Sequence, residues 1–265
     1  MSTQQHGTAL VTGASSGLGK VYADRLAKRG YDLILVARRG DKLDALAATL
    51  RAAHGVKVST LVADLGATAD LERVAATIAA DDSITLLVNN AGTSTLAPVA
   101  KTGKEQLDGM NDVNGYAVVR LSHAVLPGFV ARDRGTLINI GSVLGSFVIP
   151  GSSIYSGTKA YVQLFTQGLQ TELAETKVKV QLVLPAATAT EIWEISGVPL
   201  SALDQASVMT AENCVDAALA GLDMGEAITM PSVEDAQLLA AFEAARVALA
   251  AGTQNGKPAS RYQVK

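Results

Sequence analysis

Three side chains near the middle of the sequence could move a proton. Tyr155 and Lys159 stand four residues apart in a helical pattern, so both face the same side of the helix, and Ser142 precedes the tyrosine by 13 residues. A phenol titrates at about pH 10, and a nearby cation favours its phenolate, so the lysine would make it a usable acid or base. Tyr-x3-Lys is short enough to arise by chance, so its place in the chain must support this interpretation.

A second group of residues could hold phosphate. Gly13, Gly17 and Gly19 follow an apolar run and precede a helical pattern. Glycine permits positive φ and lets backbone N–H groups approach a pyrophosphate, and a helix N-terminus adds unpaired donors and the positive end of its dipole. The spacing differs from the G-x-G-x-x-G form of the general fingerprint. The loop favours a dinucleotide, although a simple tight turn could use the same glycines.

The next strand-like run ends in a basic pair. Arg38 and Arg39 follow Ala37, about 20 residues beyond Gly19, where an NAD-binding protein places an acid for the ribose 2′-hydroxyl. Guanidinium groups there can grip a 2′-phosphate, so the pair predicts NADP(H), with Arg38 as the main contact because it directly follows the strand. A solvated pair at a strand end is the alternative, and Asp41 nearby tempers the prediction.

Two further strand ends carry polar groups. Asp64 ends the third run, where it could accept a hydrogen bond from an adenine amino group or cap a helix. The fourth run ends in Asn89, Asn90, Ala91 and Gly92, where amides can tie the loop to its neighbours and small residues let a flat ligand lie on the backbone. Alone, this stretch could also be a turn.

The elements that position these groups alternate along the chain. Near-continuous apolar runs predict about seven buried parallel strands, at Thr8–Thr12, Asp32–Ala37, Val56–Ala63, Ile84–Val88, Gly135–Gly141, Val178–Leu184 and Ala227–Met230. Helical patterns separate them, at Leu18–Arg29, Asp41–His54, Ala69–Ala80, Gly103–Val130, Ser153–Ala174 and Ala211–Gly221, with a late helix at Glu234–Ala251. This order predicts an α/β fold, a single-domain Rossmann-like doubly wound sheet over residues 1–265 with helices on both faces.

Composition narrows the class of protein. The 265 residues are 48% apolar and carry a net charge of −3, which suits one sizeable core and offers no basic field for nucleic acid. Cys214 is the single cysteine, expected as a buried apolar group, and His6, His54 and His123 show no metal-ligand spacing, so we expect no metal. No leader or membrane span is evident, so we expect a cytoplasmic protein without a membrane partner.

Together these motifs resemble the short-chain dehydrogenase/reductase family from Thr8 to about Thr190. The resemblance rests on Thr12-Gly13-x3-Gly17-x-Gly19, Asn89-Asn90-Ala91-Gly92, Asn114, Ser142 and Tyr155-x3-Lys159, in the order and spacing of the family. It implies an oxidoreductase in which Tyr155 is the general acid or base and Ser142 holds the substrate oxygen. Lys159 would hold the nicotinamide ribose and lower the tyrosine pKa. Asn114 would interrupt its helix and hold a water that relays protons from Lys159.

The resemblance also implies a cofactor site. We expect NADP(H) to contact Gly13, Ser15, Ser16, Gly17, Leu18, Gly19, Arg38, Arg39, Asp64, Leu65, Asn90, Ala91, Gly92, Tyr155, Lys159, Pro185, Thr188 and Thr190. Two residues depart from the family pattern. Ala186 stands where a glycine is usual, and a Cβ resists positive φ, while Thr188 replaces an apolar residue.

The substrate pocket is expected beside the catalytic residues, at Leu144, Phe147, Ile192 and Trp193. In the family two stretches build this pocket, here Gly141–Thr158 and Pro185–Val208, and they contain no Lys or Arg; their only charged residues are Glu191, Glu194 and Asp204. An anionic substrate would lack a partner there, so a neutral, largely apolar ketone or aldehyde and its alcohol are favoured. Residues 185–210 are expected to form a lid, with Trp193 as its anchor or simply as core packing.

Assembly and alternatives complete the predictions. Helices Gly103–Val130 and Ser153–Ala174 carry small or apolar residues on more than one face, which predicts a homodimer or homotetramer, and the tail 252–265 would run over the surface or onto a neighbour.

Three alternative functions remain. The chain could be an NAD-dependent alcohol dehydrogenase of the same family, a lyase on the same fold, or a non-enzymatic NADP sensor. A lyase would lose the glycine loop, and a non-enzymatic NADP sensor would lose the acid–base pair.

Overall fold

The computed structural model describes residues 6–263, and it contains two compact units, Met1–Pro231 and Ser232–Lys265. Residues 1–5, which enter the expectation that no leader is present, and the last two residues of the predicted tail lie outside the described residues. A single domain over 1–265 stays a prediction.

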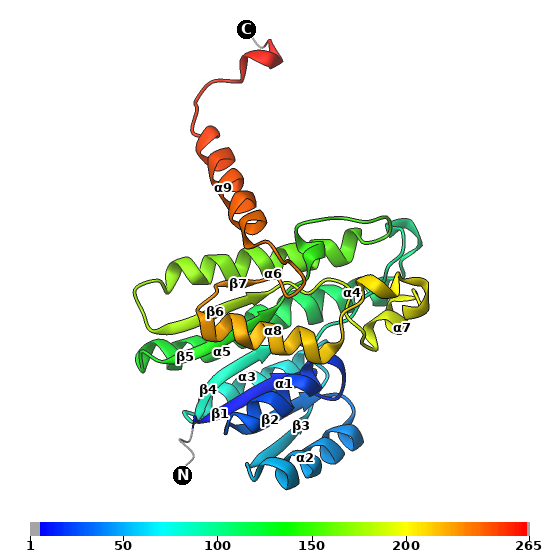
Figure 1. Cartoon of the computed structure of the whole chain (residues 1–265), viewed down its shortest axis with the longest axis vertical. Coiled ribbons are helices and arrows are strands. Elements are labelled where there is room, and N and C mark those ends of the chain that lie inside the picture. Colours follow the sequence, from blue (N-terminus) through cyan, green and yellow to red (C-terminus); the bar gives the residue numbers. More distant parts are fainter. Residues whose placement is uncertain (1–5, 264–265) are drawn as a thin grey trace. The chain divides into compact units, whose positions relative to one another are not determined.

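The first unit is built on a parallel sheet, as predicted (Figure 1). Its strand order is β3-β2-β1-β4-β5-β6-β7, so β1 lies between β2 and β4 and the order reverses there. In such sheets ligands bind beyond the carboxyl ends of the strands at this reversal. The strands are β1 (Thr8–Thr12), β2 (Asp32–Ala37), β3 (Val58–Val62), β4 (Ile84–Asn89), β5 (Gly135–Ile140), β6 (Val178–Val183) and β7 (Ile228–Thr229).

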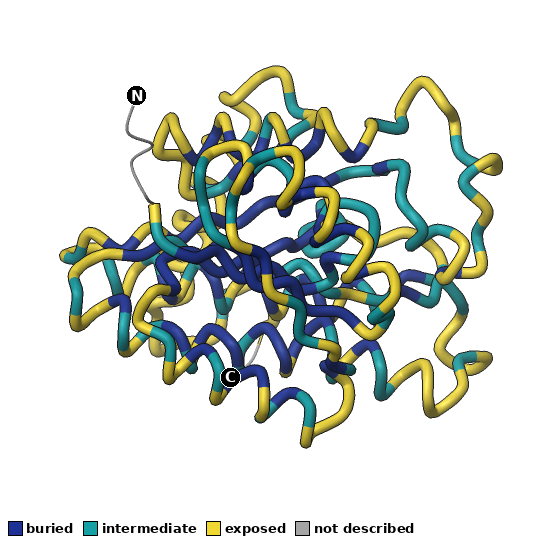
Figure 2. Tube along the Cα trace, turned by 90° about the horizontal axis from the view of Figure 1, so that it is seen from below, coloured by how far each residue is buried: buried dark blue, intermediate teal, exposed yellow. Residues whose placement is uncertain are grey.

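Helices cover both faces of this sheet, and the buried residues concentrate along its strands (Figure 2). One apolar cluster joins the sheet to α1 (Gly17–Lys28), α2 (Gly40–His54) and α8 (Ala211–Met224). A second cluster joins the other face to α3 (Thr68–Ala80), α5 (Ala117–Ala131) and α6 (Ser153–Glu172). Cys214 on α8 is buried, as predicted, and burial raises its thiol pKa to about 11.

The helix expected over Gly103–Val130 is interrupted. It consists of α4 (Lys104–Asn111), the π-helical turn η2 (Asp112–Tyr116) and α5. A π turn inserts one residue into the helical register and is common at functional sites. Asn114 lies inside it, so the interruption that the family resemblance implied is present.

Short elements complete the loops at the carboxyl end of the sheet. They are η1 (Val99–Lys101), η3 (Val143–Gly145), α7 (Ile192–Ser196), η4 (Leu200–Ala202) and η5 (Gln205–Ser207). The last three fall within the predicted lid, whose role as a lid stays a prediction.

The second unit contains α9 (Ala236–Gly252) and η6 (Ser260–Tyr262). Helix α9 begins after Asp235, whose carboxylate accepts a hydrogen bond from the backbone N–H of Gln237 at 2.9 Å. It has no buried residue, although much of it is apolar.

The described residues contain neither a helix that could span a membrane nor a group of potential metal ligands. None of their helices has the length and apolar character needed to cross a membrane. In the same range, no three His, Cys, Asp or Glu side chains are grouped so that they could hold a metal ion.

Candidate active site

A cavity of about 970 Å³ opens at the carboxyl ends of the strands and gathers the motifs that the sequence singled out. Every residue expected to contact the cofactor lines this cavity, with the exception of Gly19. Gly19 lies behind the loop, where a Cβ would overlap the carbonyl oxygen of Gly13 and the side-chain amide of Asn90. Its role is therefore to let helix α1 approach the loop closely.

The glycine loop has the backbone that a phosphate cradle requires. Gly13 and Gly17 have φ angles of +67° and +52°, in the left-handed region that favours glycine. The N-cap residue of α1, Ser16, makes no side-chain capping hydrogen bond, so the first N–H groups of the helix are open to a ligand. These features favour the phosphate-binding interpretation over a simple turn.

Thr12 holds the glycine loop against the end of β4. Its Oγ1 accepts hydrogen bonds from the backbone N–H groups of Asn90 and Ala91, both at 3.0 Å, and donates to the carbonyl of Val88 at 3.2 Å. The amide of Asn90 donates to the Thr12 carbonyl at 2.9 Å. The small residues at the end of β4 are thereby fixed along the cavity floor.

A buried polar network stands behind this floor. The amide nitrogen of Asn89 donates to Asn139 Oδ1 at 3.0 Å and to Ser122 Oγ at 3.1 Å. Asn139 in turn donates to Thr166 Oγ1 at 2.9 Å. The network ties β4 and β5 to α5 and α6. Sequence reasoning expected such a tie from Asn89 but missed Asn139, whose only signal is an amide within an apolar strand.

The two arginines at the end of β2 behave differently. Arg39 is 39% exposed, and its guanidinium donates to Ser15 Oγ at 3.0 and 3.2 Å, to Ser16 Oγ at 2.7 Å and to Glu191 at 2.7 Å. Arg38 lines the same cavity but is exposed, and it has no hydrogen bond or ion pair to another described residue. Only Arg39 is thus tied to the glycine loop.

Asp64 lies on the cavity wall and does not cap a helix. The N-cap of α3 is Ala67. The Asp64 carboxylate instead accepts a hydrogen bond from the backbone N–H of Gly66 at 3.0 Å. Of its two possible roles, the capping role is therefore wrong, and the adenine contact stays a prediction.

Ser142 reaches the cavity at the end of β5 and begins η3. Its Oγ accepts a hydrogen bond from the Leu144 N–H at 3.1 Å, and the next residue, Val143, donates to the Pro185 carbonyl at 3.0 Å. Helix α6 approaches η3 so closely that a Cβ at Gly145 would lie 2.9 Å from the Lys159 carbonyl. This close packing brings the serine to Tyr155, with which it forms a hydrogen bond.

Burial controls the proton affinities of Tyr155 and Lys159. Lys159 is 5% exposed, its Nζ donates to the Ile140 carbonyl at 3.0 Å, and burial lowers its pKa to about 8. Burial raises the pKa of Tyr155 to about 12, while its hydrogen bond with Ser142 acts in the opposite direction. The lysine lies 5.7 Å from the centre of the tyrosine ring. A lowered tyrosine pKa, which the family resemblance implied, is not found here because desolvation outweighs the hydrogen bond.

Asn114 does not line the cavity but lies directly behind it, fully buried. Its Oδ1 accepts from the Thr93 N–H at 2.8 Å, and its Nδ2 donates to the Thr93 carbonyl at 2.9 Å and to Thr158 Oγ1 at 3.1 Å. A Cβ at Gly92 would lie 3.3 Å from Asn114 Oδ1 and 3.8 Å from Lys159 Nζ. The π turn, the end of β4 and the lysine therefore converge.

The loop after β6 contains Ala186 and Thr188, the two residues that depart from the family pattern, and neither strains the backbone. Asp133 and Gln263 are the non-glycine residues with positive φ among those described, so Ala186 has an ordinary backbone conformation. Thr188 is buried, and its carbonyl accepts a hydrogen bond from the Trp193 indole at 2.9 Å. Trp193 also lines the cavity, so it is anchored to the loop rather than packed in the core.

Apolar side chains surround the catalytic end of the cavity. Leu144, Ile192 and Trp193 line it as predicted, whereas Phe147 does not and is 57% exposed. The lining cations are Arg38, Arg39 and Lys159. Ile149 and Ile195, which belong to the two stretches expected to build the pocket, also line it. Sequence reasoning missed the apolar Leu96 and the acidic Glu105, Asp108 and Asp112. No local signal marked them, because only the tertiary fold brings these segments to the cavity.

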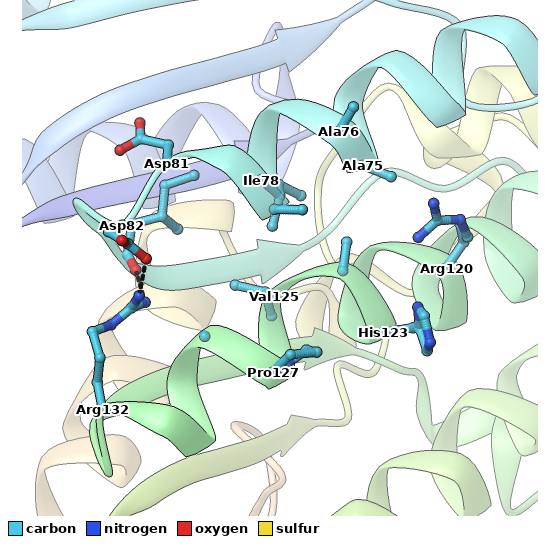
Figure 3. A pocket seen from close by; sticks show the side chains of 14 residues that line it. Ala75, Ala76, Ile78, Asp81, Asp82, Arg120, His123, Val125, Pro127 and Arg132 are labelled. Atoms are coloured by element: carbon cyan, nitrogen blue, oxygen red, sulfur yellow. Dashed lines mark hydrogen bonds and ion pairs between the residues drawn. The ribbon is translucent and has the colours of Figure 1, made fainter.

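A second, smaller cavity of about 270 Å³ lies between α3 and α5 (Figure 3). Arg132 and Asp82 form an ion pair at one end of it, and Arg120 and His123 line the other. None of the motif residues lines this cavity, so the larger one is the candidate active site.

Comparison with known proteins agrees with this geometry. The family model described as short chain dehydrogenase matches residues 7–197. A very-long-chain 3-oxoacyl-CoA reductase of Anas platyrhynchos is 37% identical over 71% of this chain, but the match spans only 62% of that relative. An NADP-dependent 3-hydroxy acid dehydrogenase of Salmonella typhi is 37% identical, with 83% of this chain and 86% of the relative covered.

Solved structures extend the similarity to almost the whole chain. A short-chain dehydrogenase from Sphingobium yanoikuyae in complex with NADPH has a TM-score of 0.92 and 43% identity, over 96% of this chain and 98% of that one. A bulky-bulky ketone specific alcohol dehydrogenase from Comamonas testosteroni has a TM-score of 0.90 and 37% identity, over 98% and 99%.

Proposed function

The chain belongs to the short-chain dehydrogenase family, and from this we propose that it is an NADP(H)-dependent oxidoreductase that interconverts a ketone or aldehyde and the corresponding alcohol. The family expected from the motifs is thereby confirmed. One observation carries the proposal: a single cavity brings together the open glycine loop, a basic pair and the group of Ser142, Tyr155 and Lys159. The similarity of the whole chain to a short-chain dehydrogenase in complex with NADPH supports NADP(H) as the cofactor.

The residues present fit a dinucleotide phosphate. A Cβ at Gly13 would lie 2.8 Å from the Asn90 amide nitrogen, so only glycine lets the loop pack this closely against the end of β4. The positive φ of Gly13 and Gly17 and the uncapped N-terminus of α1 suit a bound pyrophosphate. Arg39, beside Ser15 and Ser16, is the better placed cation for a 2′-phosphate, and Lys159 would hold the nicotinamide ribose. The bound nicotinamide supplies or accepts the hydride.

The catalytic residues suit carbonyl reduction. Ser142 would orient the carbonyl oxygen by a hydrogen bond, and Tyr155 would protonate that oxygen as negative charge develops on it. A phenol with a pKa of about 12 is protonated at neutral pH, which is the form a general acid needs. A lysine with a pKa of about 8 is largely charged there and can stabilise the phenolate that remains.

Asn114 is proposed to support a proton relay. Both hydrogens of its amide are used by Thr93 and Thr158, so a relay water would bond to an oxygen of Asn114. The closeness of Asn114 and Lys159 to Gly92 supports a path from the lysine toward the π turn.

The substrate is proposed to be neutral, largely apolar and bulky. The catalytic end has apolar walls, and its one lining cation is the proposed catalytic lysine, so an anionic substrate would enter without a partner. The relative from Comamonas testosteroni, described as specific for bulky-bulky ketones, supports this size class.

The enzyme is also proposed to form a homodimer or homotetramer. Tyr116, Tyr161 and Leu164, at the outer faces of η2 and α6, are exposed apolar side chains that a second copy could cover. Light scattering should give a multiple of the 27.3 kDa monomer mass at micromolar concentration. A monomer would contradict the proposal. The cytoplasmic location stays a prediction from the sequence.

Activity is tested with a panel of aldehydes, of aryl and alkyl ketones of increasing size, and of the corresponding alcohols. Turnover is measured by the change in NADPH or NADH absorbance. We expect turnover of bulky neutral ketones with NADPH. Equal use of NADH would favour the NAD-dependent alternative, and no turnover with any carbonyl or alcohol would contradict the proposal. A lyase or a cofactor sensor is less well supported, because the glycine loop and the Tyr155–Lys159 pair are both present in one cavity.

A further inference from the structure

The proposed 2′-phosphate site already holds an internal anion. The carboxylate of Glu191 accepts a hydrogen bond from Arg39 Nη1 at 2.7 Å, and its other oxygen lies 3.4 Å from Lys42 Nζ. Hydrogen bonding to Arg39 holds the pKa of Glu191 below its ordinary value, so it is anionic at neutral pH. Glu191 lines the cavity, beside the guanidinium that the proposed function assigns to the cofactor.

The remaining donors of Arg39 leave little room for a second anion. A guanidinium has five N–H donors. Nε and Nη2 of Arg39 donate to Ser15 and Ser16, and Nη1 donates to Glu191, which occupies four of the five. A phosphate that binds in the bidentate manner needs two parallel donors, so it must displace at least one of these partners, and Glu191 is the partner whose negative charge repels it.

Glu191 also connects the β2–α2 corner, the segment 38–42 that carries Arg39 and Lys42, to the side of the cavity where the substrate is proposed to bind. It directly precedes α7, and the cavity-lining Ile192 and Trp193 follow it in the chain. The ion pair therefore links the β2–α2 corner to the segment 191–196, which is part of the predicted lid.

We propose that Glu191 is a specificity-determining residue that competes with the cofactor's 2′-phosphate for Arg39, and that phosphate binding releases the segment 191–196 from the β2–α2 corner. This inference rests on the proposed function. A cofactor without the 2′-phosphate would leave the ion pair intact. The two cofactors would thus differ in affinity and also in their effect on the segment 191–196, which NADP(H) would release from the β2–α2 corner and NAD(H) would not.

Titration calorimetry with adenosine 2′,5′-bisphosphate and with 5′-AMP tests the competition without turnover. Because the pair is about 40% exposed on both sides, we expect Glu191→Gln to bind the bisphosphate about 3- to 10-fold more tightly and 5′-AMP unchanged. Glu194→Gln is the matched control, since it removes an exposed carboxylate from the same segment that has no ion pair among the described residues. Unchanged or weaker bisphosphate binding by Glu191→Gln would overturn the inference.

The fluorescence of Trp193, the single tryptophan, tests the release. In the wild type, the bisphosphate should change its emission and 5′-AMP should not. Glu191→Gln should show the changed emission before any ligand is added, and an identical wild-type response to both nucleotides would contradict the release. A different failure would concern the proposed function: if the wild type bound the bisphosphate no better than 5′-AMP, its NADP(H) preference would be wrong.

Discussion

The two ends of the cavity hold their cations in opposite ways. Lys159 is 5% exposed and donates to a backbone carbonyl, and no acid among the described residues pairs with it. Arg39 is 39% exposed and is surrounded by two hydroxyl groups and a carboxylate. Desolvation therefore dominates at the catalytic end, where it shifts pKa values, whereas solvent screens the charges at the adenosine end. The difference suits the proposed roles, which are proton transfer at one end and selection of the cofactor at the other.

The largest effect should come from Tyr155→Phe. The change removes the proposed proton donor but keeps the ring, so we expect kcat to fall about 10²–10⁴-fold while NADPH binding is nearly unchanged. Steady-state rates and a binding titration would measure both. Tyr161→Phe, at an exposed position on the same helix, is the control. A variant with more than about a tenth of wild-type kcat would contradict the role of Tyr155.

Lys159→Met should separate function from stability. We expect a large loss of kcat but a gain in the free energy of unfolding of about 1–2 kcal/mol, because a desolvated charge is removed and only one hydrogen bond is lost. Its lowered pKa means that the native state disfavours the charged lysine, so the gain should be complete below about pH 8 and disappear as pH rises toward the ordinary value of 10.5. Denaturant unfolding of both proteins across this pH range would measure the gain. A gain that did not change with pH would contradict the idea that it comes from removing a buried charge.

The adenosine end should respond by changing cofactor preference. Arg39→Leu removes the cation bound to Ser15 and Ser16, so we expect the preference for NADPH over NADH to fall about 10- to 100-fold. The effect should appear mainly in KM, because the adenosine phosphate is remote from the hydride. The ratio of kcat/KM for the two cofactors measures it. An unchanged ratio would mean that Arg39 plays no part in the selection.

The smallest effect should come from Arg38→Leu. Its side chain is exposed and has no described partner, so we expect the cofactor preference to change by less than about threefold. The same kinetic comparison applies. If Arg38→Leu reduced the preference for NADPH more than Arg39→Leu did, Arg38 would be the main phosphate contact, as the sequence predicted, and the choice of Arg39 from the structure would be wrong.

This last pair shows where sequence reasoning ends. The sequence predicted a basic pair at the end of β2, because strand periodicity and the distance from the glycine loop are local properties. It favoured Arg38 because that residue directly follows the strand. Neighbouring side chains on an extended chain point to opposite faces, however, and the pattern cannot say which one meets the loop. Contacts with Ser15, Ser16 and Glu191 decide that, and they join segments more than 20 residues apart.

Other parts of the fold and site show the same limit. The positions of six long helical patterns and of the strands followed from apolar periodicity, and the glycine positions followed from the backbone that a phosphate loop needs. The buried amide of Asn139 and the acids that α4 places along the cavity could not be predicted, because only packing between distant segments brings them there. The direction of the Tyr155 pKa shift was missed for a related reason: spacing shows which charges are near but not how much water burial removes.

The central position of β1 has a consequence for the kinetics of folding. β1 is the first strand of the chain, yet it pairs with β4 as well as β2, so its second edge stays open until residue 89 has been synthesised. The glycine loop and the threonine that anchors it depend on that pairing. Contacts between distant segments slow folding because loop closure must come first. We therefore expect ribosome-bound chains that end before β4 to remain sensitive to protease at β1, and protection to begin once β4 has left the ribosome.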